Sequence, residues 1–458
     1  MSTQLTENKM GTMKIPKLLF SISVPIIISM LVQALYNIVD SIFVARYDPD
    51  AGTGALGLAF PIQMLSIAVA TGLGVGMNAL LSRALGQKNK DKADLIAGQG
   101  VFLTACAYLV FLIFGLFLTE PFVNMQKDAT GLLREYSIEY ISIVCVFSLG
   151  LFVQVTCERL LQATGKSVFS MITQLSGAVT NIILDPILIF GYLGAPEMGV
   201  RGAAIATVIG QGVSAVVGIV LNLTVNREIT LKIKNFIPKL KLLCEMLAIS
   251  IPSVLMQAIG SVMTFSMNAI LLKFSGAALN VFTVYFKLQS FIFMPVFGLN
   301  NGMIPIIAYN FGAQKKDRIY QTMKLSALSA VAYMALGLAA FQIIPGGLLG
   351  FFNASAEMLE IGKMALRIIS ISFIMAGFSI VSISTCQALG KSIYSLIVSV
   401  IRQLLVLIPA AYLLSLSGNV NLVWWAFPIA ELVGCTACII FVNIVLKKTV
   451  SHIKSSGQ

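Results

Sequence analysis

Long apolar runs dominate the pattern of this chain. Runs of about twenty residues recur from one end to the other, and each is long enough to cross about 30 Å of hydrocarbon as a helix. We expect twelve spans, near 17–45, 54–82, 94–118, 137–161, 168–192, 201–224, 242–272, 279–309, 320–344, 362–387, 394–416 and 422–446. The loops between them are short, so neighbouring helices should be antiparallel. The predicted fold class is an all-α polytopic membrane protein.

Composition agrees with this interpretation. Of the 458 residues, 57% are hydrophobic and only 11% are charged, whereas a soluble domain carries roughly 25% charged residues. The net charge of +12 does not indicate a nucleic-acid partner, because the charges fall between apolar runs. The first run, Leu18 to Ala45, is too long for a signal peptide and should stay as a helix. The expected surroundings are therefore the lipid bilayer.

The distribution of lysine and arginine among the loops determines the orientation of the chain in the membrane. With the N-terminus in the cytoplasm, 22 of the 31 Lys and Arg residues fall on the cytoplasmic side, seven fall outside, and Lys287 and Arg402 fall within spans. We therefore expect both termini to be cytoplasmic. In a bacterium, this places a multi-pass protein in the cytoplasmic (inner) membrane.

The second half of the sequence repeats the first. A shift of about 226 residues aligns Ser23-Val24-Pro25 with Ser250-Ile251-Pro252, and it aligns Gln63 with Gln289, Gly72 with Gly298 and Gly76 with Gly302. Six spans per half give both copies the same topology, so a pseudo-two-fold axis along the membrane normal should relate two six-helix lobes. The predicted organisation is an N-terminal lobe (1–225), a cationic cytoplasmic linker (226–241) and a C-terminal lobe with a short tail (242–458).

Two aspartates break this symmetry. Asp40 lies deep in the first expected span and Asp185 deep in the fifth, whereas the shift places Met267 and Ile408 at their positions. An ionisable group in the middle of a bilayer costs about 2.5–3.5 kcal/mol on insertion scales. Each acid therefore needs a function or a partner, and both belong to the first half alone.

Each aspartate has polar neighbours on its own helix face. The spacing i, i+3, i+4, i+7 gathers Gln33, Tyr36, Asn37 and Asp40 on one stripe. Asn181 precedes Asp185 by one turn, and Thr207 precedes Gln211 in the same way. Carboxylate, amide and hydroxyl oxygens can coordinate Na⁺, in which case Asp40 and Asp185 are the charged ligands. A desolvated, mutually repelling pair can instead hold a proton, and hydrogen-bonded helix packing is the remaining alternative.

Other polar residues within the spans have weaker interpretations. Glu431 and Lys287 can line a cavity or extend to the interface, and Arg402 should pair with a carbonyl or an acid. We expect Glu158 and Arg159, near a cytoplasmic end, to be interfacial.

Several motifs resemble enzyme sites without meeting their requirements. Thr164-Gly-Lys-Ser and Leu389-Gly-Lys-Ser lack the first glycine of a phosphate loop, since Leu160 and Thr385 occupy that position. No ATP-hydrolysing machinery is visible, which favours a process driven by an ion gradient. Gly72-Leu-Gly-Val-Gly76 lies inside an apolar span and should permit close helix contact. No catalytic set is apparent, so we expect neither an enzyme nor a cofactor.

The residues named above resemble those of a known family. The run from Ser23 to Asp40, the segment Arg83-Ala-Leu-Gly-Gln-Lys-Asn, Leu184-Asp-Pro186 and the repeated Gln-Ala-x-Gly-Lys-Ser turns are similar to the multidrug and toxic compound extrusion (MATE) family, in its bacterial DinF/MepA-like branch. The resemblance covers essentially the whole chain. It implies efflux of cationic, lipophilic compounds in exchange for Na⁺ or H⁺. It also implies a coupling site in the N-terminal lobe at Asp40, Asn181, Asp185 and Thr207.

We predict that drugs bind in a cavity between the lobes, lined by amide, aromatic and methionine side chains. The candidates are Gln33, Tyr36, Asn37, Gln63, Met64, Gln257, Met263, Gln289 and Met294. Methionine adapts to varied apolar ligands, and aromatic faces attract cations. The protein should act as a monomer. Two alternatives to a drug antiporter are a flippase for a lipid-linked precursor and a membrane receptor or scaffold that transports nothing.

Overall fold

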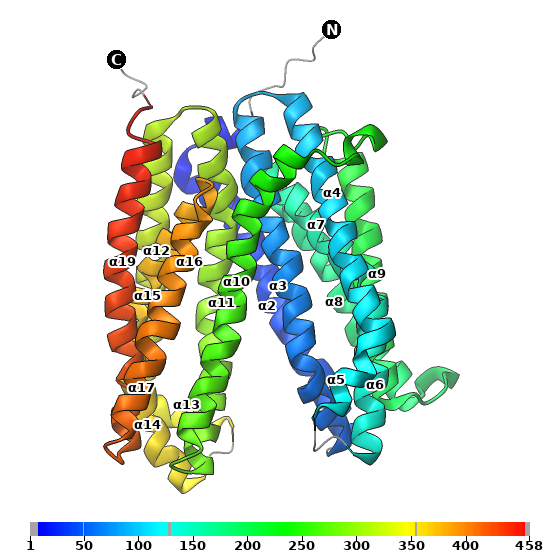
Figure 1. The fold of residues 1–458 in the computed structure, drawn as a ribbon, viewed down its shortest axis with the longest axis vertical. Helices are drawn as coiled ribbons and strands as arrows, with labels where there is room; N and C mark the ends of the chain where they lie inside the picture. Colours follow the sequence, from blue (N-terminus) through cyan, green and yellow to red (C-terminus); the bar gives the residue numbers. More distant parts are fainter. Residues whose placement is uncertain (1–7, 49, 127–129, 353–354, 454–458) are drawn as a thin grey trace. The chain divides into compact units, whose positions relative to one another are not determined.

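The computed structural model describes residues 8–48, 50–126, 130–352 and 355–453, and every regular element in these ranges is helical (Figure 1). The first-half elements are α1 (Lys9–Thr12), α2 (Ile15–Tyr47), α3 (Ala51–Gly86), α4 (Lys90–Ile113), η1 (Phe114–Leu118), α5 (Thr119–Asn124), α6 (Gly131–Val146), α7 (Leu149–Ala163), α8 (Ser167–Phe190), η2 (Tyr192–Gly194) and α9 (Gly199–Thr224). The remaining elements are η3 (Ile233–Phe236), α10 (Leu240–Leu271), α11 (Gly276–Gly312), α12 (Lys316–Ile343), α13 (Pro345–Gly350), α14 (Ala356–Ser370), α15 (Phe373–Ala388), α16 (Ser392–Ser399), η4 (Val400–Leu407), α17 (Ile408–Ser415), α18 (Val420–Val423) and α19 (Ala426–Thr449).

The predicted polytopic all-α fold is confirmed. Among the described residues, ten helical stretches are long and apolar enough to cross a membrane, and two bent helix pairs bring the number to as many as twelve. Their positions follow the twelve expected spans. Helical structure satisfies every backbone hydrogen bond within the segment, which a bilayer interior requires.

The two bent pairs occupy corresponding places in the repeats. α6 and α7 meet at 44°, and α14 and α15 meet at 48°, where continuous spans were expected. A serine lies at each break: Ser148 Oγ donates to Cys145 O at 2.7 Å, and Ser372 Oγ donates to Ile369 O at 2.6 Å. Serine hydroxyls that bond to the preceding turn compete with the helical ladder and bend helices. By contrast, α2, α3, α10 and α11 each continue as one helix through their internal prolines.

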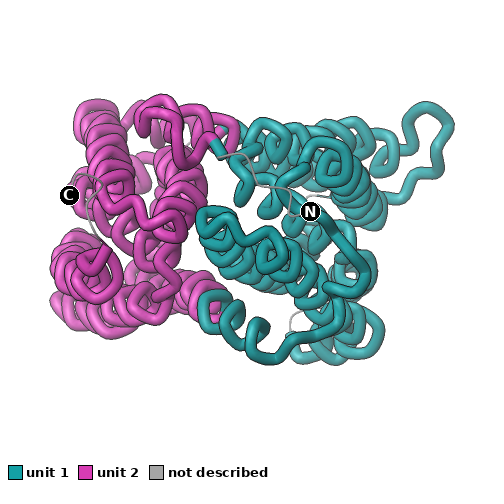
Figure 2. Tube along the Cα trace, turned by 90° about the horizontal axis from the view of Figure 1, so that it is seen from above, with its two compact units in different colours: residues 1–8, 28–250 teal, residues 9–27, 251–458 magenta. Residues whose placement is uncertain are grey.

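Contacts divide the chain into two compact units, coloured separately in Figure 2. Unit 1 comprises residues 1–8 and 28–250, and unit 2 comprises residues 9–27 and 251–458. The division falls inside α2 and inside α10, so each of these helices contributes to both units. The units therefore differ from the predicted lobes 1–225 and 242–458, whose boundaries stay a prediction.

The same serine contact occurs once in each unit. In unit 2, Ser23 Oγ donates to Leu299 O at 3.4 Å, and in unit 1, Ser250 Oγ donates to Leu73 O at 3.4 Å. The repeat shift aligns these two serines with each other and these two leucines with each other. The start of each half's first span therefore packs in an equivalent way on the second span of the other half.

Glycine makes the helix contact in unit 1 possible. A Cβ on Gly76 would lie 2.8 Å from Met246 O, and a Cβ on Gly74 would lie 2.6 Å from Arg159 Cγ. Both distances are shorter than real Cβ contacts allow. The expectation that this glycine run permits close helix contact is confirmed.

The predicted linker is held against α4 in unit 1. Gln99 Nε2 donates to Asn235 O at 2.7 Å and to Ile237 O at 2.8 Å, while its Oε1 accepts from Lys239 N at 2.8 Å. Asp94 Oδ1 accepts from Thr230 N at 2.7 Å. Both side chains are buried, so these bonds are shielded from competing water.

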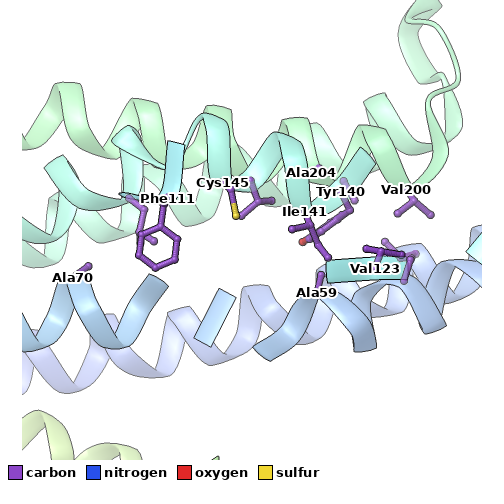
Figure 3. Close-up of a cluster of buried hydrophobic side chains, with 14 of the residues drawn as sticks. Ala59, Ala70, Phe111, Val123, Tyr140, Ile141, Cys145, Val200 and Ala204 are labelled. Carbon is purple, nitrogen blue, oxygen red and sulfur yellow. The ribbon is translucent and has the colours of Figure 1, made fainter. Parts of the chain in front are cut away.

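The apolar core of unit 1 lies beside its polar residues. Figure 3 shows part of this core, including Phe111, Tyr140, Ile141 and Cys145. Phe111 packs against Phe152 with ring centroids 5.5 Å apart. Tyr140 is almost fully buried, and its hydroxyl is the polar edge of this cluster.

Candidate functional site

The two aspartates that break the repeat lie on α2 and α8 of unit 1. Asp185 is fully buried, and Asp40 Oδ1 is also inaccessible to solvent. The two carboxyl groups are close enough to interact electrostatically. Two helices far apart in the sequence therefore bring the acids within electrostatic range of each other, and a shared ion site at this place stays a prediction.

Asn181 and Asp185 are joined by a hydrogen bond within α8. Asn181 Nδ2 donates to Asp185 Oδ1 at 3.2 Å. Four buried acceptor oxygens nearby have no hydrogen-bond partner in the described part of the chain: Asp40 Oδ1, Asn181 Oδ1, Asp185 Oδ2 and Gln211 Oε1. Buried acceptors without donors are costly. A set of them indicates a place for a cation, a proton or a water molecule.

A small cavity adjoins Asn181 and Gln211, and neither aspartate is among the residues that line it. Its volume is about 20 Å³, and it is lined by Tyr36, Gln154, Gln174, Gly177, Ala178, Asn181, Thr207, Gly210, Gln211 and Ser214. A water molecule needs a cavity of roughly 10–15 Å³. The cavity therefore has room for one water or one small ion and is too small for a drug.

Tyr36 is near enough to three acids to interact with them electrostatically. Its hydroxyl is within electrostatic reach of Asp40, Glu158 and Asp185, and it forms a hydrogen bond with Gln33. Four helices, α2, α7, α8 and α9, supply the residues of this site.

Thr207 and Gln63 meet at a different hydroxyl. Gln63 Nε2 donates to the Tyr140 hydroxyl at 3.0 Å, and Thr207 also forms a hydrogen bond with Tyr140. Thr207 faces the small cavity as well. This residue connects the predicted ion site to the apolar core described above.

Glu158, which was expected to be interfacial, is hydrogen-bonded to residues of the polar cluster. Gln154 Nε2 donates to Glu158 Oε1 at 3.0 Å. With its amide nitrogen turned toward the carboxylate, Gln174 donates to Oε1 at 2.9 Å and to Oε2 at 3.2 Å. Both glutamines line the cavity, so Glu158 belongs to the polar cluster, and its interfacial position stays a prediction. The i, i+4 spacing of Gln154 and Glu158 was the available signal.

The other predicted drug-cavity residues are more dispersed. In unit 1, Asn37 is exposed and Met64 is half-buried. In unit 2, Gln257 and Met263 lie on α10, and Gln289 and Met294 lie on α11. Their gathering around one substrate cavity stays a prediction.

Unit 2 pairs its own intramembrane charges. Arg402 Nη1 lies 2.7 Å from Glu431 Oε1, and the two side chains are 18% and 14% exposed. The expectation that Arg402 pairs with an acid is confirmed. Lys287 is exposed, and its Nζ lies 5.9 Å from the centre of the Phe352 ring.

The described residues contain no cluster of three or more His, Cys, Asp or Glu side chains that could hold a metal ion. A transition metal would need such a cluster. A sodium ion at Asp40 and Asp185 would instead take its remaining oxygens from amide and hydroxyl groups.

Comparison with known proteins bears on both repeats. The family model described as MatE matches residues 25–187 and again residues 252–413, in agreement with the internal repeat. The chain is 26% identical over 440 residues to the multidrug export protein MepA of Staphylococcus haemolyticus, covering 96% of each protein. It is 24% identical over 431 residues to MepA of Staphylococcus aureus (strain MSSA476), covering 93% of each.

Solved structures share the fold. A crystal structure of MATE in complex with MaL6 has a TM-score of 0.90 at 23% identity, covering 98% of this chain and 100% of that one. A MOP superfamily transporter from Pyrococcus furiosus has a TM-score of 0.90 at 23% identity, covering 98% and 99%. Because the family model matches both repeats and well over half of the residues, the chain belongs to the MatE family.

Proposed function

We propose that this protein is a multidrug efflux antiporter that exports cationic, lipophilic compounds in exchange for H⁺ or Na⁺ by alternating access. Membership of the MatE family and likeness to proteins named MepA multidrug export protein support this proposal. The observation that carries it is the pair of carboxyl groups of Asp40 and Asp185, which interact electrostatically and each have a buried oxygen without a hydrogen-bond donor in the described part of the chain.

In this proposal the coupling ion binds in unit 1. Asp40 and Asp185 supply negative charge, and Asn181 and Thr207 supply neutral oxygens. Carboxylate, amide and hydroxyl oxygens suit Na⁺. A proton shared by the two carboxyl groups would relieve the same repulsion. In either case the ion offsets the cost of burying two like charges.

Exchange follows from competition for this charge. A lipophilic cation is attracted by ionised carboxylates in a medium of low dielectric constant. When H⁺ or Na⁺ neutralises Asp40 and Asp185, that attraction is lost and the drug is released. We propose that the same event reshapes α2 near Pro25, two residues before the helix passes from unit 2 into unit 1.

We further propose a monomer in the bacterial cytoplasmic membrane with both termini in the cytoplasm. The distribution of Lys and Arg supports this orientation. A tag at either end should be accessible to membrane-impermeant reagents only after the cell is permeabilised. Labelling in intact cells would contradict the orientation.

The decisive experiment imposes the two ion gradients separately. Purified protein is reconstituted into liposomes, and ethidium transport is followed by fluorescence with an inward Na⁺ gradient, with a pH gradient, or with neither. One gradient should drive ethidium against its concentration. Transport indifferent to both gradients would contradict the proposed antiport.

The same liposomes test the flippase alternative. Such a protein needs several free cations along its path, whereas Arg402 is paired with Glu431 and Lys287 is exposed. A fluorescent lipid-linked pyrophosphate should therefore not be flipped faster than in protein-free vesicles. Rapid flipping without ethidium transport would favour the alternative.

A further inference from the structure

Unit 2 contains an ion pair at the place that corresponds to the small cavity of unit 1. A shift of 224 residues aligns Ala206 with Ala430 and Gly210 with Gly434, and it places Glu431 at the position of Thr207. A shift of 225 aligns Ser167 with Ser392, both at the start of their helices, and it places Arg402 at the position of Gly177, whereas the shift of 223 that pairs Asp185 with Ile408 places it at Val179. Glu431 therefore corresponds to the cavity-lining Thr207, and Arg402 falls within two residues of the position of Gly177.

The packing supports this correspondence. In unit 1, α8 and α9 approach closely, and a Cβ on Gly210 would lie 2.8 Å from Gly177 O. In unit 2, η4 and α19 meet in the same way, and a Cβ on Gly434 would lie 3.0 Å from Arg402 Cδ. Gly210 and Gly434 are both buried. The arginine side chain thus crosses the glycine that in unit 1 borders the cavity.

The pair is partly buried, and its hydrogen bonding is incomplete. Apart from the 2.7 Å contact between Nη1 and Oε1, Arg402 Nε and Glu431 Oε2 have no partner within the described residues. Arg402 also lies in a π-helical segment, η4, where unit 1 has a regular α-helix. π-helical turns are rare and are frequent at functional sites.

We propose that unit 2 holds a second monovalent-cation site, with Glu431 as its carboxylate and the Arg402 guanidinium as its permanent occupant. A buried carboxylate requires a cation. The Arg402 guanidinium is covalently attached to the chain, so it is present at high effective concentration and cannot leave. Unit 2 is therefore always loaded, and only unit 1 can exchange an ion. That consequence rests on the proposed function, whereas the site itself does not.

The test removes the built-in cation and supplies a free one. Arg402→Met and Arg402→Met/Glu431→Gln are made in the Asp40→Asn/Asp185→Asn background, so that unit 1 cannot contribute. Melting temperature is measured in detergent, in NaCl and in N-methyl-D-glucamine chloride of equal ionic strength, with and without millimolar methylguanidinium.

The Arg402→Met protein should melt below the double-substituted one, because it keeps an unpaired buried carboxylate. Na⁺ or methylguanidinium should raise its melting temperature by about 1–2 °C, as expected when a ligand near ten times its Kd binds only the folded state of a chain of this length. The protein that also carries Glu431→Gln should not respond. If the Arg402→Met protein fails to accumulate and the added Glu431→Gln substitution restores its accumulation, the unpaired carboxylate causes the loss, and this outcome supports the proposal. A folded Arg402→Met protein with no cation response would overturn the proposal, whatever the fate of the unit 1 site.

Discussion

Asn181 donates a hydrogen bond to Asp185 across one turn of α8, while its own carbonyl oxygen faces the interior without a donor. One amide thus stabilises a buried acid and presents an acceptor beside the small cavity. Satisfied helix packing would not leave an oxygen in this state. The relationship therefore favours an ion or proton site over packing alone.

Neutralising either aspartate should abolish transport. We expect Asp40→Asn and Asp185→Asn each to lower ethidium efflux to the level of cells without the protein, because the coupling charge is lost while shape is kept. Efflux from cells and the amount of protein in the membrane are measured together. Asp91→Asn, on an exposed acid in the first turn of α4, is the matched control and should transport normally. Normal efflux by both site variants would exclude the proposed coupling site.

Removing the Asn181 amide should weaken ion binding. A hydrogen bond to a charged group is worth about 1.5–3 kcal/mol, so Asn181→Ala should raise the ion concentration for half-maximal transport by roughly 10-fold or more. The maximal rate should change less. The control is Thr180→Ala on the same helix, where the hydroxyl bonds only to Ser176 O. An equal effect of the two variants would indicate a general disturbance of α8.

Glu158 should contribute to transport, although its position in the sequence did not indicate a role in the site. Its carboxylate accepts from Gln154 and lies within electrostatic reach of Tyr36. We expect Glu158→Gln to reduce ethidium transport several-fold, about 1 kcal/mol of interaction, because the site loses negative charge. Glu139→Gln on the adjacent α6 serves for comparison. Unchanged transport by Glu158→Gln would show that this acid is structural.

Alanine substitutions of two glycines on α3 should have opposite effects on stability, because one glycine lies in a close helix contact and the other faces open space. Gly76→Ala should destabilise the protein by about 1–3 kcal/mol, because its Cβ would collide with Met246 O, a backbone atom that cannot rotate away. Gly57→Ala meets nothing within 4 Å and should gain up to about 1 kcal/mol of helix propensity. Thermal melting in detergent checks both. Similar melting temperatures for the two variants would contradict the predicted contact.

The linker should loosen when Gln99 is removed. Gln99→Ala deletes three hydrogen bonds to the segment from Asn235 to Lys239. Trypsin should then cut at Lys232 and Lys234 several-fold faster, since cleavage needs local opening. Gln87→Ala, at an exposed position in the preceding turn, should leave the rate unchanged. Equal digestion of both variants would mean that other contacts hold the linker.

Several features of the fold followed from the sequence. Twelve apolar runs predicted the helices, because a bilayer leaves the backbone no other partner. The offset of the repeats predicted the two matches to the family model. Asp40 and Asp185 were visible as candidates, since a charge within an apolar run is costly and conspicuous. Their role as one site stays a prediction, which the electrostatic influence of Asp40 on Asp185 supports.

Contacts between helices were decided by tertiary structure. Apolar periodicity does not determine how a helix is rotated against its neighbours, so Glu158 could not be assigned to the polar cluster. The breaks at Ser148 and Ser372 also escaped notice, because serine is common in membrane helices and bends them only in some surroundings. The partner of Arg402 was open between a carbonyl and an acid until α19 placed Glu431 within 2.7 Å. The sequence thus determined which segments enter the membrane, and the packing of side chains across helices decided which charges are paired and which remain available.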